Sequence, residues 1–307
     1  MFENPVHRIS RRIRDVFWDG LTRKIGERNL VALVTDDKTT TVDGRRYVYV
    51  PHRDEDAYEY LSTVADRHPD LRISVVRLPE VVTPEWVRSR NGRHGLLSLA
   101  LTRSADGGRE GKPFVVPGGR FNEMYGWDSY FETPGLMVDG RVDLAKAMVD
   151  NFVYEIEYYG KILNANRSYY LTRSEPPFLT SMALAVYRHL PDDTASVVWL
   201  RNVFRAAIKE YREVWIGEAR LTKIGLSRYY GSGIGPPPEV EPGHCDAVYA
   251  PYAERLGMTV DLNSLLYKIE LDIAQTIERQ FADSLALEDG SVERGSSWYR
   301  RVGDERS

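Results

Sequence analysis

The sequence predicts a mainly α-helical protein with a small α+β segment at its N-terminal end. Three observations support this fold class. Apolar residues return every three or four positions through several long stretches, most of them after residue 140, and this is the period of a helix buried on one face. Residues 30–52 instead alternate polar and apolar side chains, which is the period of a strand. Long loops separate the helical stretches.

Residues 4–26 are expected to form a basic amphipathic helix. Its apolar stripe recurs at three- and four-residue steps and comprises Val6, Ile9, Ile13, Phe17 and Leu21. The arginines beside this stripe are compatible with a helix that lies on a membrane surface or binds calmodulin. We favour the simpler interpretation, a helix with one solvated face that packs on the main body of the protein.

A short α+β segment is expected after this helix. The pattern predicts a strand over residues 46–51, a helix over 55–67 and a short strand over 71–78. No catalytic constellation occurs in this segment. A further helix is predicted over residues 84–103, and a polar, glycine-rich loop over 107–111.

Four more helices are predicted in the second half of the chain. The first begins near Asp143, which can cap it, and the second covers residues 178–190 and ends at Pro191. The third covers residues 197–215 and the fourth residues 262–281. Their apolar stripes are Leu144, Met148, Phe152 and Ile156 in the first, Leu200, Phe204, Ala207, Ile208 and Tyr211 in the third, and Leu265, Leu266, Ile269, Ile273 and Ile277 in the fourth.

Composition argues against several classes of function. The 307 residues carry a net charge of −4, which favours neither a nucleic-acid nor a membrane partner. Cys245 is the only cysteine, so an intrachain disulfide cannot form. No apolar segment follows Met1, and we expect a cytoplasmic protein. His244, Cys245 and Asp246 are metal-ligand types, but one short cluster rarely makes a metal site, and we interpret it as structural.

Residues 117–130 combine the residue types that suit a polyhydroxylated ligand. The Pro-Gly-Gly turn at their start lets the backbone approach a ligand closely. Arg120 brings a planar fork of donors, Trp127 brings a flat apolar face, and Asp128 brings an acceptor beside that face. Sugar hydroxyls need paired donors and acceptors, and the C–H faces of a sugar need an apolar plate. The alternative from these residues alone is a buried tryptophan beside a structural Arg–Asp ion pair.

The same stretch, Pro-Gly-Gly-Arg-Phe-Asn-Glu-Met-Tyr-Gly-Trp-Asp-Ser-Tyr, resembles the first signature of the trehalases. These are glycosidases that split α,α-trehalose into two glucose molecules. Four further matching segments follow in order, at residues 164–177, 225–230, 237–239 and 261–268. The combination is similar to the neutral, cytosolic trehalases of fungi in particular, and it covers most of residues 4–285.

The resemblance implies a toroid of six helical hairpins around a central cleft, the (α/α)6 fold, of which this chain would hold a part. It divides the chain into an N-terminal lead-in at residues 1–83, a partial catalytic domain at 84–287 and a polar tail at 288–307. The implied mechanism is single-step inversion by an acid and a base carboxyl about 6.5–9.5 Å apart, with no metal or cofactor. By motif, the residues implied to contact trehalose are Arg120, Trp127, Asp128, Asn164, Arg173, Ser174, Glu175 and Glu239.

The chain departs from the family pattern where the catalytic carboxyls are expected. Similar trehalases carry the acid in an Arg-Glu-Ser-Gly-x-Asp motif, but here Val260 joins Asp261 with no such segment before it. A Gln-Trp-Asp-x-Pro signature and the later base glutamate are absent too. The best local carboxyl candidates are Asp128, Glu123, Glu155, Glu175 and Glu239. No catalytic residue is assigned, and we expect the chain as given to be inactive.

Two consequences follow from the other departures. Glu175 stands where the family usually has glutamine, and a carboxylate cannot donate a hydrogen bond to a sugar unless it is protonated. The hairpins present would expose an apolar face that the rest of the toroid covers, which favours association through that face. A non-catalytic trehalose-binding or regulatory protein, paired with a full-length trehalase, is the alternative function. The third alternative is a different sugar-processing helical toroid.

Overall fold

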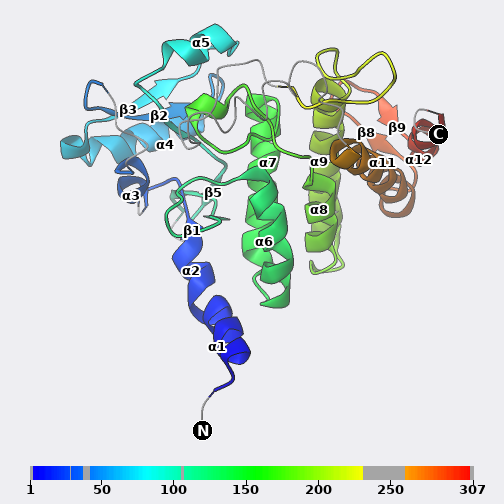
Figure 1. The fold of residues 1–307 in the computed structure, drawn as a ribbon, viewed down its shortest axis with the longest axis horizontal. Coiled ribbons are helices and arrows are strands. Elements are labelled where there is room, and N and C mark those ends of the chain that lie inside the picture. The colour runs from blue at the N-terminus through cyan, green and yellow to red at the C-terminus, as the bar shows by residue number, and fades with distance from the viewer. Residues whose placement is uncertain (1–2, 28, 37–41, 105–106, 231–259, 305–307) are drawn as a thin grey trace.

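The computed structural model describes residues 3–27, 29–36, 42–104, 107–230 and 260–304. Figure 1 shows a small sheet with its helices at one end, a row of upright helices in the middle and a helix pair with a hairpin at the other end. Helices dominate this arrangement, which confirms the mainly α prediction. Among the described residues, no helix has both the length and the apolar composition needed to cross a membrane.

The N-terminal sheet has three parallel strands in the order β3-β2-β4, namely β3 (Ile73–Arg77), β2 (Arg46–Val50) and β4 (Gly95–Leu97). Helix α4 (Glu55–Asp66) connects β2 to β3, and Asp54 caps it by accepting a hydrogen bond from the backbone N–H of Ala57. The two strands and the helix predicted in this segment are confirmed. Short α3 (Leu30–Val34) and the 3₁₀ turn η3 (Pro69–Leu71) complete the segment.

The N-terminal helix is shorter than predicted. It runs through α1 (Pro5–Arg12), the π-helical turn η1 (Ile13–Phe17) and α2 (Trp18–Leu21), and it ends because β1 (Thr22–Arg23) pairs with β7 (Phe114–Val115). Trp18 is buried, and its indole N–H donates to Asp139 at 2.7 Å. No side chain of α1 is buried, and Figure 1 shows α1 extending away from the rest of the chain. Of the predicted stripe, only Ile13 and Leu21 pack against the core.

The prediction of a helix over residues 84–103 is wrong beyond Ser89. Helix α5 (Pro84–Ser89) stops before Gly92, whose φ of +75° suits glycine and ends the helix. The chain then forms β4, and β5 (Leu101–Arg103) pairs with β6 (Arg109–Gly111) inside the predicted polar loop. Gly95 allows β4 to lie close to β2, because a Cβ at this position would lie 2.1 Å from the carbonyl oxygen of Tyr47 on β2.

The four helices predicted in the second half are confirmed as α7 (Val142–Tyr159), α8 (Leu179–Tyr187), α9 (Thr194–Glu210) with the π-helical turn η5 (Tyr211–Trp215), and α11 (Val260–Gln280). Their predicted stripes are buried, except that Leu265 is half-buried. Asp143 lies inside the first turn of α7, and Arg141 occupies the N-cap position. Helix α7 packs against α6 (Gly126–Val138), α8 and α9, so it forms the centre of the row.

The last described segment folds on α11. A hairpin of β8 (Leu285–Ala286) and β9 (Val292–Glu293) leads into α12 (Gly295–Asp304), which packs against α11. Trp298 is fully buried there, and its indole N–H donates to Glu293 at 2.9 Å. Trp298, within the expected polar tail, thus belongs to the core, while the division of the chain into three parts stays a prediction.

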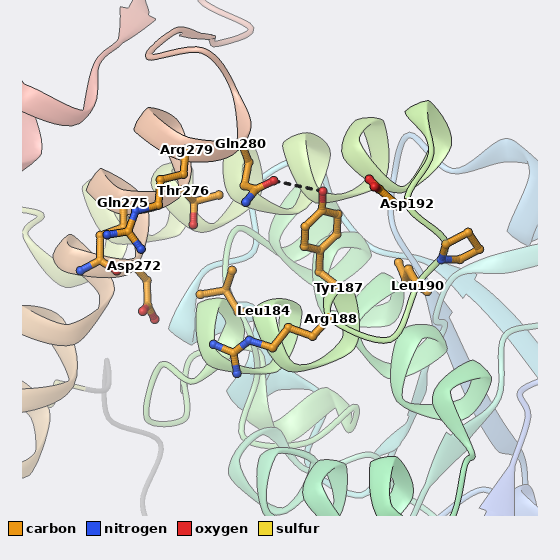
Figure 2. Close-up of a pocket in the computed structure, with 11 residues that line it drawn as sticks. Leu184, Tyr187, Arg188, Leu190, Asp192, Asp272, Gln275, Thr276, Arg279 and Gln280 are labelled. Carbon is orange, nitrogen blue, oxygen red and sulfur yellow. Dashed lines mark hydrogen bonds between the residues drawn. The ribbon is translucent and has the colours of Figure 1, made fainter.

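Figure 2 shows the groove between α8 and α11, which has a volume of about 460 Å³. Tyr187 donates to Gln280 across it at 3.2 Å. None of the eleven residues that line it belongs to a predicted site motif, so the groove is separate from the site described next.

Candidate functional site

Three motifs that are far apart in the sequence are tied together by their backbones. Single antiparallel bridges join Tyr125 to Ala165 and Leu163 to Ser174. The backbone N–H of Gly126 also donates to the carbonyl oxygen of Asn164 at 3.3 Å. The end of the first signature therefore lies beside the Asn-x-Asn-Arg segment, which in turn lies beside the Arg-Ser-Glu segment. Helix α6 begins at this junction.

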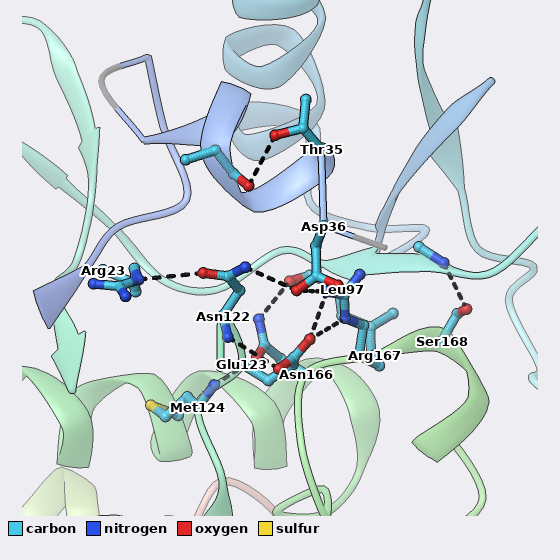
Figure 3. Close-up of polar contacts among 12 residues, drawn as sticks. Arg23, Thr35, Asp36, Leu97, Asn122, Glu123, Met124, Asn166, Arg167 and Ser168 are labelled. Carbon is cyan, nitrogen blue, oxygen red and sulfur yellow. Dashed lines mark hydrogen bonds and ion pairs between the residues drawn. The ribbon is translucent and has the colours of Figure 1, made fainter. Parts of the chain in front are cut away.

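Asn166 fastens this junction to the N-terminal sheet. Its side-chain oxygen accepts from the backbone N–H of Met124 at 2.8 Å, and its side-chain nitrogen donates to the carbonyl oxygen of Leu97 at 3.2 Å. The carbonyl oxygen of Asn166 accepts in turn from the N–H of Leu97 at 2.9 Å. Figure 3 shows these contacts converging between the sheet and the two motif segments. Asn166 is fully buried, so its side-chain amide satisfies two backbone groups that water cannot reach, and its own carbonyl oxygen satisfies a third.

Glu123, a local carboxyl candidate, belongs to a buried ion pair. Its Oε1 accepts from Nε of Arg167 at 2.5 Å, and both side chains are completely inaccessible to water. The Oε2 of Glu123 accepts from the N–H of Asn122 at 3.1 Å, and Oδ2 of Asp36 lies 3.5 Å from Nη2 of Arg167 (Figure 3). Both oxygens of Glu123 are engaged by these contacts and both side chains are buried, so Glu123 and Arg167 are structural.

Trp127 and Asp128 lie in the first turn of α6. The Trp127 side chain is 47% exposed, which rules out the alternative of a buried core tryptophan. Arg120 is exposed, its guanidinium lies 4.6 Å from the ring centre of Phe121, and no ion pair joins it to Asp128, although the structure describes both residues. The pKa of Asp128 is raised by burial, and hydrogen bonds from its own backbone N–H and from Trp127 act in the opposite direction.

Glu175 packs directly against the start of α6. A Cβ on Gly126 would lie 2.6 Å from both Cβ and Cγ of Glu175, so only glycine allows this approach. Glu175 is 5% exposed. Burial, and then the charge of Asp128, raise the pKa of Glu175 to about 8. The raised pKa favours the protonated form at neutral pH, and a protonated carboxyl can donate a hydrogen bond.

Glu132 is a half-buried carboxyl near Asp128 that the sequence interpretation missed. It lies four residues after Asp128 on α6, so the two side chains share one face of the helix. Its Oε2 is buried with no hydrogen-bond partner in the described part of the chain, and burial followed by the charge of Asp128 raises its pKa to about 8. The available signal was the four-residue spacing, which has meaning only once α6 is recognised as a helix.

Two more acids hold the segment that carries the Asn-x-Asn-Arg motif. Glu155 on α7 accepts from the N–H of Leu163 at 3.0 Å, and Glu210 on α9 accepts from the N–H of Ile162 at 2.7 Å. Burial raises the pKa of Glu155 well above its ordinary value and that of Glu210 to about 7. Glu155, another local candidate, is fully buried behind the site and acts as a structural acceptor.

The remaining predicted contacts are placed as follows. Asn164 and Arg173 are half-buried at the motif junction. The Ser174 hydroxyl accepts from Nη2 of Arg220 at 2.7 Å, so Arg220 fixes the position of this hydroxyl. Glu239 and the His244-Cys245-Asp246 cluster lie outside the described residues. In the described ranges no group of three or more histidine, cysteine or acidic residues is arranged to hold a metal ion.

Comparisons with known proteins agree with this geometry. The trehalase family model matches residues 1–259. A cytosolic neutral trehalase of Emericella nidulans is 44% identical over 364 residues, covering 98% of this chain and 48% of that protein. One from Neurospora crassa is 42% identical, covering 98% of this chain and 49% of that protein. The chain thus spans about half the length of these curated relatives.

A solved structure supports the same assignment. The neutral trehalase Nth1 from Saccharomyces cerevisiae matches with a TM-score of 0.88 and 38% identity, covering 98% of this chain and 65% of that one. The alignment with the Emericella nidulans relative is 364 residues long, whereas the chain has 307, so at least 57 aligned positions have no counterpart here. The predicted resemblance and the predicted fold, part of a helical toroid, are confirmed. By sequence and by fold, this chain belongs to the trehalase family.

Proposed function

We propose that this chain is part of a trehalase whose substrate is α,α-trehalose and whose reaction is hydrolysis to two glucose molecules. The observation that carries the proposal is the backbone pairing of residues 125–126, 163–165 and 174. That pairing gathers three of the motif segments at the start of α6. Relatives that match nearly the whole chain are named cytosolic neutral trehalases, so we also propose a cytoplasmic location.

Each predicted contact has a role that its chemistry supports. The exposed ring of Trp127 offers an apolar plate to the C–H face of a glucose unit. Asp128 beside it accepts from sugar hydroxyls, and Arg120 and Arg173 donate to sugar oxygens. The amide of Asn164 can do both, while Ser174 is positioned by Arg220. Glu239 stays a proposed contact on the strength of its motif alone.

Catalysis needs an acid and a base that the matched motifs do not provide. In single-step inversion one carboxyl protonates the leaving oxygen while a second activates water on the opposite face of the sugar. Glu123 and Glu155 are structural, and the acid and base motifs of similar trehalases are absent from the sequence. We therefore expect the 307-residue chain to bind trehalose without sustained turnover. A binding or regulatory role is the alternative.

The exposed apolar face of α6 favours association with another protein surface. Trp127, Phe131, Pro134 and Val138 are exposed at three- and four-residue steps along this helix. We propose that a protein surface covers the part of this stripe beyond the sugar site. Sedimentation velocity of the purified chain measures this directly, and a strict monomer at tens of micromolar would contradict self-association.

The test of the proposed function measures trehalose binding and glucose release by the same purified, cooperatively melting chain. We expect binding that Trp127→Ala weakens about tenfold or more, because the apolar plate is lost. Phe17→Ala is the matched control, since Phe17 is a ring of similar exposure, 42%, on the N-terminal helix. No glucose release is expected.

Two results would contradict this account. A folded chain that does not bind trehalose would refute the proposed substrate. Sustained glucose release, abolished by Asp128→Ala and absent from a mock purification, would show that the catalytic carboxyls lie among the residues of this chain.

A further inference from the structure

Three carboxyl groups meet at the start of α6. Asp128 and Glu132 lie one turn apart on the helix, and Glu175 approaches from the Arg-Ser-Glu segment over the bare backbone of Gly126. Glu175 is nine-tenths or more buried, and it has no hydrogen bond or ion pair with any described residue. Glu132 likewise has a buried oxygen without a partner in the described ranges. Both glutamates therefore have carboxyl oxygens that are available to form hydrogen bonds with a ligand.

The charged groups around the cluster do not neutralise it. Arg220, on the segment after η5, donates to Ser174 and stacks over the ring of Trp215 at 4.4 Å. Lys161 follows α7; burial and then the charge of Arg220 lower its pKa to about 8, while the charge of Glu210 acts in the opposite direction. Tyr229, which also feels the charge of Glu175, donates its hydroxyl to Asp261 at 3.0 Å. Arg173 lies two residues before Glu175 in sequence and makes contacts of its own.

Three ionised carboxylates without a neutralising cation would raise the free energy of the folded state at this site. Burial removes the water that stabilises each charge, and the charges repel one another. Asp128 is the member best able to keep its charge, because it lies at the positive end of the α6 dipole and accepts hydrogen bonds. The two glutamates relieve the repulsion by holding protons, and the pKa of each rises to about 8.

We propose that Glu175 acts in this site as a protonated hydrogen-bond donor to the sugar, which makes sugar binding dependent on pH. This inference rests on the proposed function and adds a specificity-determining residue to it. The neutral carboxyl supplies the donor that the amide of glutamine supplies in the family pattern. Loss of its proton removes the donor and places a second negative charge beside Asp128, facing the lone pairs of the bound sugar oxygen.

The sign of the pH dependence follows from this chemistry. Below about pH 8 Glu175 keeps its proton and the site binds. Above that value each pH unit removes about tenfold of the binding-competent form, so the dissociation constant is expected to rise about tenfold per unit. The variant Glu175→Gln donates at every pH, and its binding is expected to stay flat from pH 6 to pH 9.5.

The experiment combines a trehalose titration with direct detection of the proton. Titration calorimetry of the full chain at pH 6, 7, 8 and 9 gives the dissociation constant, and thermal melts at each pH verify that the chain is folded. Side-chain carboxyl ¹³C resonances of glutamate-labelled protein report protonation, with Glu175→Gln identifying the resonance of interest. Glu132→Gln is the matched control, because it removes the other buried glutamate and leaves Glu175 in place.

The outcomes separate this inference from the proposed function. Binding that weakens with pH in the chain and in Glu132→Gln, but not in Glu175→Gln, supports the inference. A Glu175 carboxyl that is ionised at pH 7, or pH dependence that survives in Glu175→Gln, overturns it. If neither the chain nor Glu175→Gln binds trehalose at pH 6, the proposed function fails, and the carboxyl titration still decides the state of Glu175.

Discussion

At the scale of single residues, burial decides which carboxyls are available for chemistry. The sequence offered five local candidates of equal chemical type, and the structure separates the four that it describes. Glu123 is neutralised by Arg167, and Glu155 accepts from a backbone N–H behind the site. Glu175 and the unpredicted Glu132 lie beside Asp128 without a cation. Residue type in a motif predicts what a side chain can do, whereas partners and solvent access decide what it does.

Glu132 should make the stability of the fold depend on pH. Its pKa is near 4.5 in the unfolded chain and about 8 in the folded one, so between these values the folded state binds more protons. Raising the pH through this window therefore lowers the free energy of unfolding. Glu132→Gln removes the titrating group, and we expect it to be more stable than the wild-type chain by on the order of 2 kcal/mol at pH 8 and by much less at pH 5.

Thermal melts of both proteins at pH 5, 6, 7 and 8 measure this difference. Surface Glu218→Gln serves as the control, because Glu218 is exposed and its substitution should change the melting temperature equally at each pH. A stability difference for Glu132→Gln that stays constant from pH 5 to pH 8 would show that Glu132 does not carry a shifted pKa.

At the scale of elements, periodicity predicted the long helices and missed the element that matters most. Helices α7, α9 and α11 carry long apolar stripes, and the sequence alone was sufficient to find them. Helix α6 contains Pro134 and Gly135 and exposes Trp127 and Phe131, so it lacks a clean pattern. Since α6 was missed, the one-turn relation of Asp128 and Glu132 was missed with it.

The short apolar run at residues 95–101 shows a second limit of periodicity. A helix and a buried strand have similar sequences over so few positions, and the long-range partner decides between them. Here Gly95 fits against Tyr47 of β2, a contact some fifty residues away in sequence that no local pattern reveals. The Asn91-Gly92 pair, a turn signal whose glycine takes a positive φ, was a local signal against a continuous helix.

The junction between α6 and the Arg-Ser-Glu segment should be sensitive to a single methyl group. Gly126→Ala forces a Cβ to within 2.6 Å of Glu175, and we expect a loss of about 1–3 kcal/mol in stability because one of the two elements must move. Trehalose binding should weaken as well, since Asp128 and Glu175 are displaced from each other. Chemical denaturation and a trehalose titration measure the two effects.

Gly119→Ala is the matched control in the same signature. A Cβ at Gly119 would meet nothing within 4 Å, and its φ is not positive, so its stability should change by less than about 0.5 kcal/mol. Equal stability losses for the two alanine variants would contradict the close approach of Glu175 to the α6 backbone.

At the scale of the whole molecule, the chain contains the motifs implied to contact trehalose and lacks the motifs that carry the acid and the base in similar trehalases. The sequence resemblance predicted the family and the toroid, and both are supported by a TM-score of 0.88 over 98% of the chain. The resemblance could not predict which side chains are buried or paired. Those features depend on contacts between distant segments, such as the hydrogen bonds of the Asn166 side chain with Met124 and Leu97. The described motif segments of the proposed binding site nevertheless lie on backbone that pairs within this chain.

The most direct test of a trehalose site at the start of α6 is an NMR titration that follows the indole N–H resonances of the six tryptophans. The Trp127 resonance, identified by its loss in Trp127→Phe, is predicted to shift in a saturable way as trehalose is added. Those of Trp215 and Trp298, which are fully buried, are predicted to stay in place. A Trp127 resonance that does not move at saturating trehalose, in a chain that is folded, would contradict the proposed site.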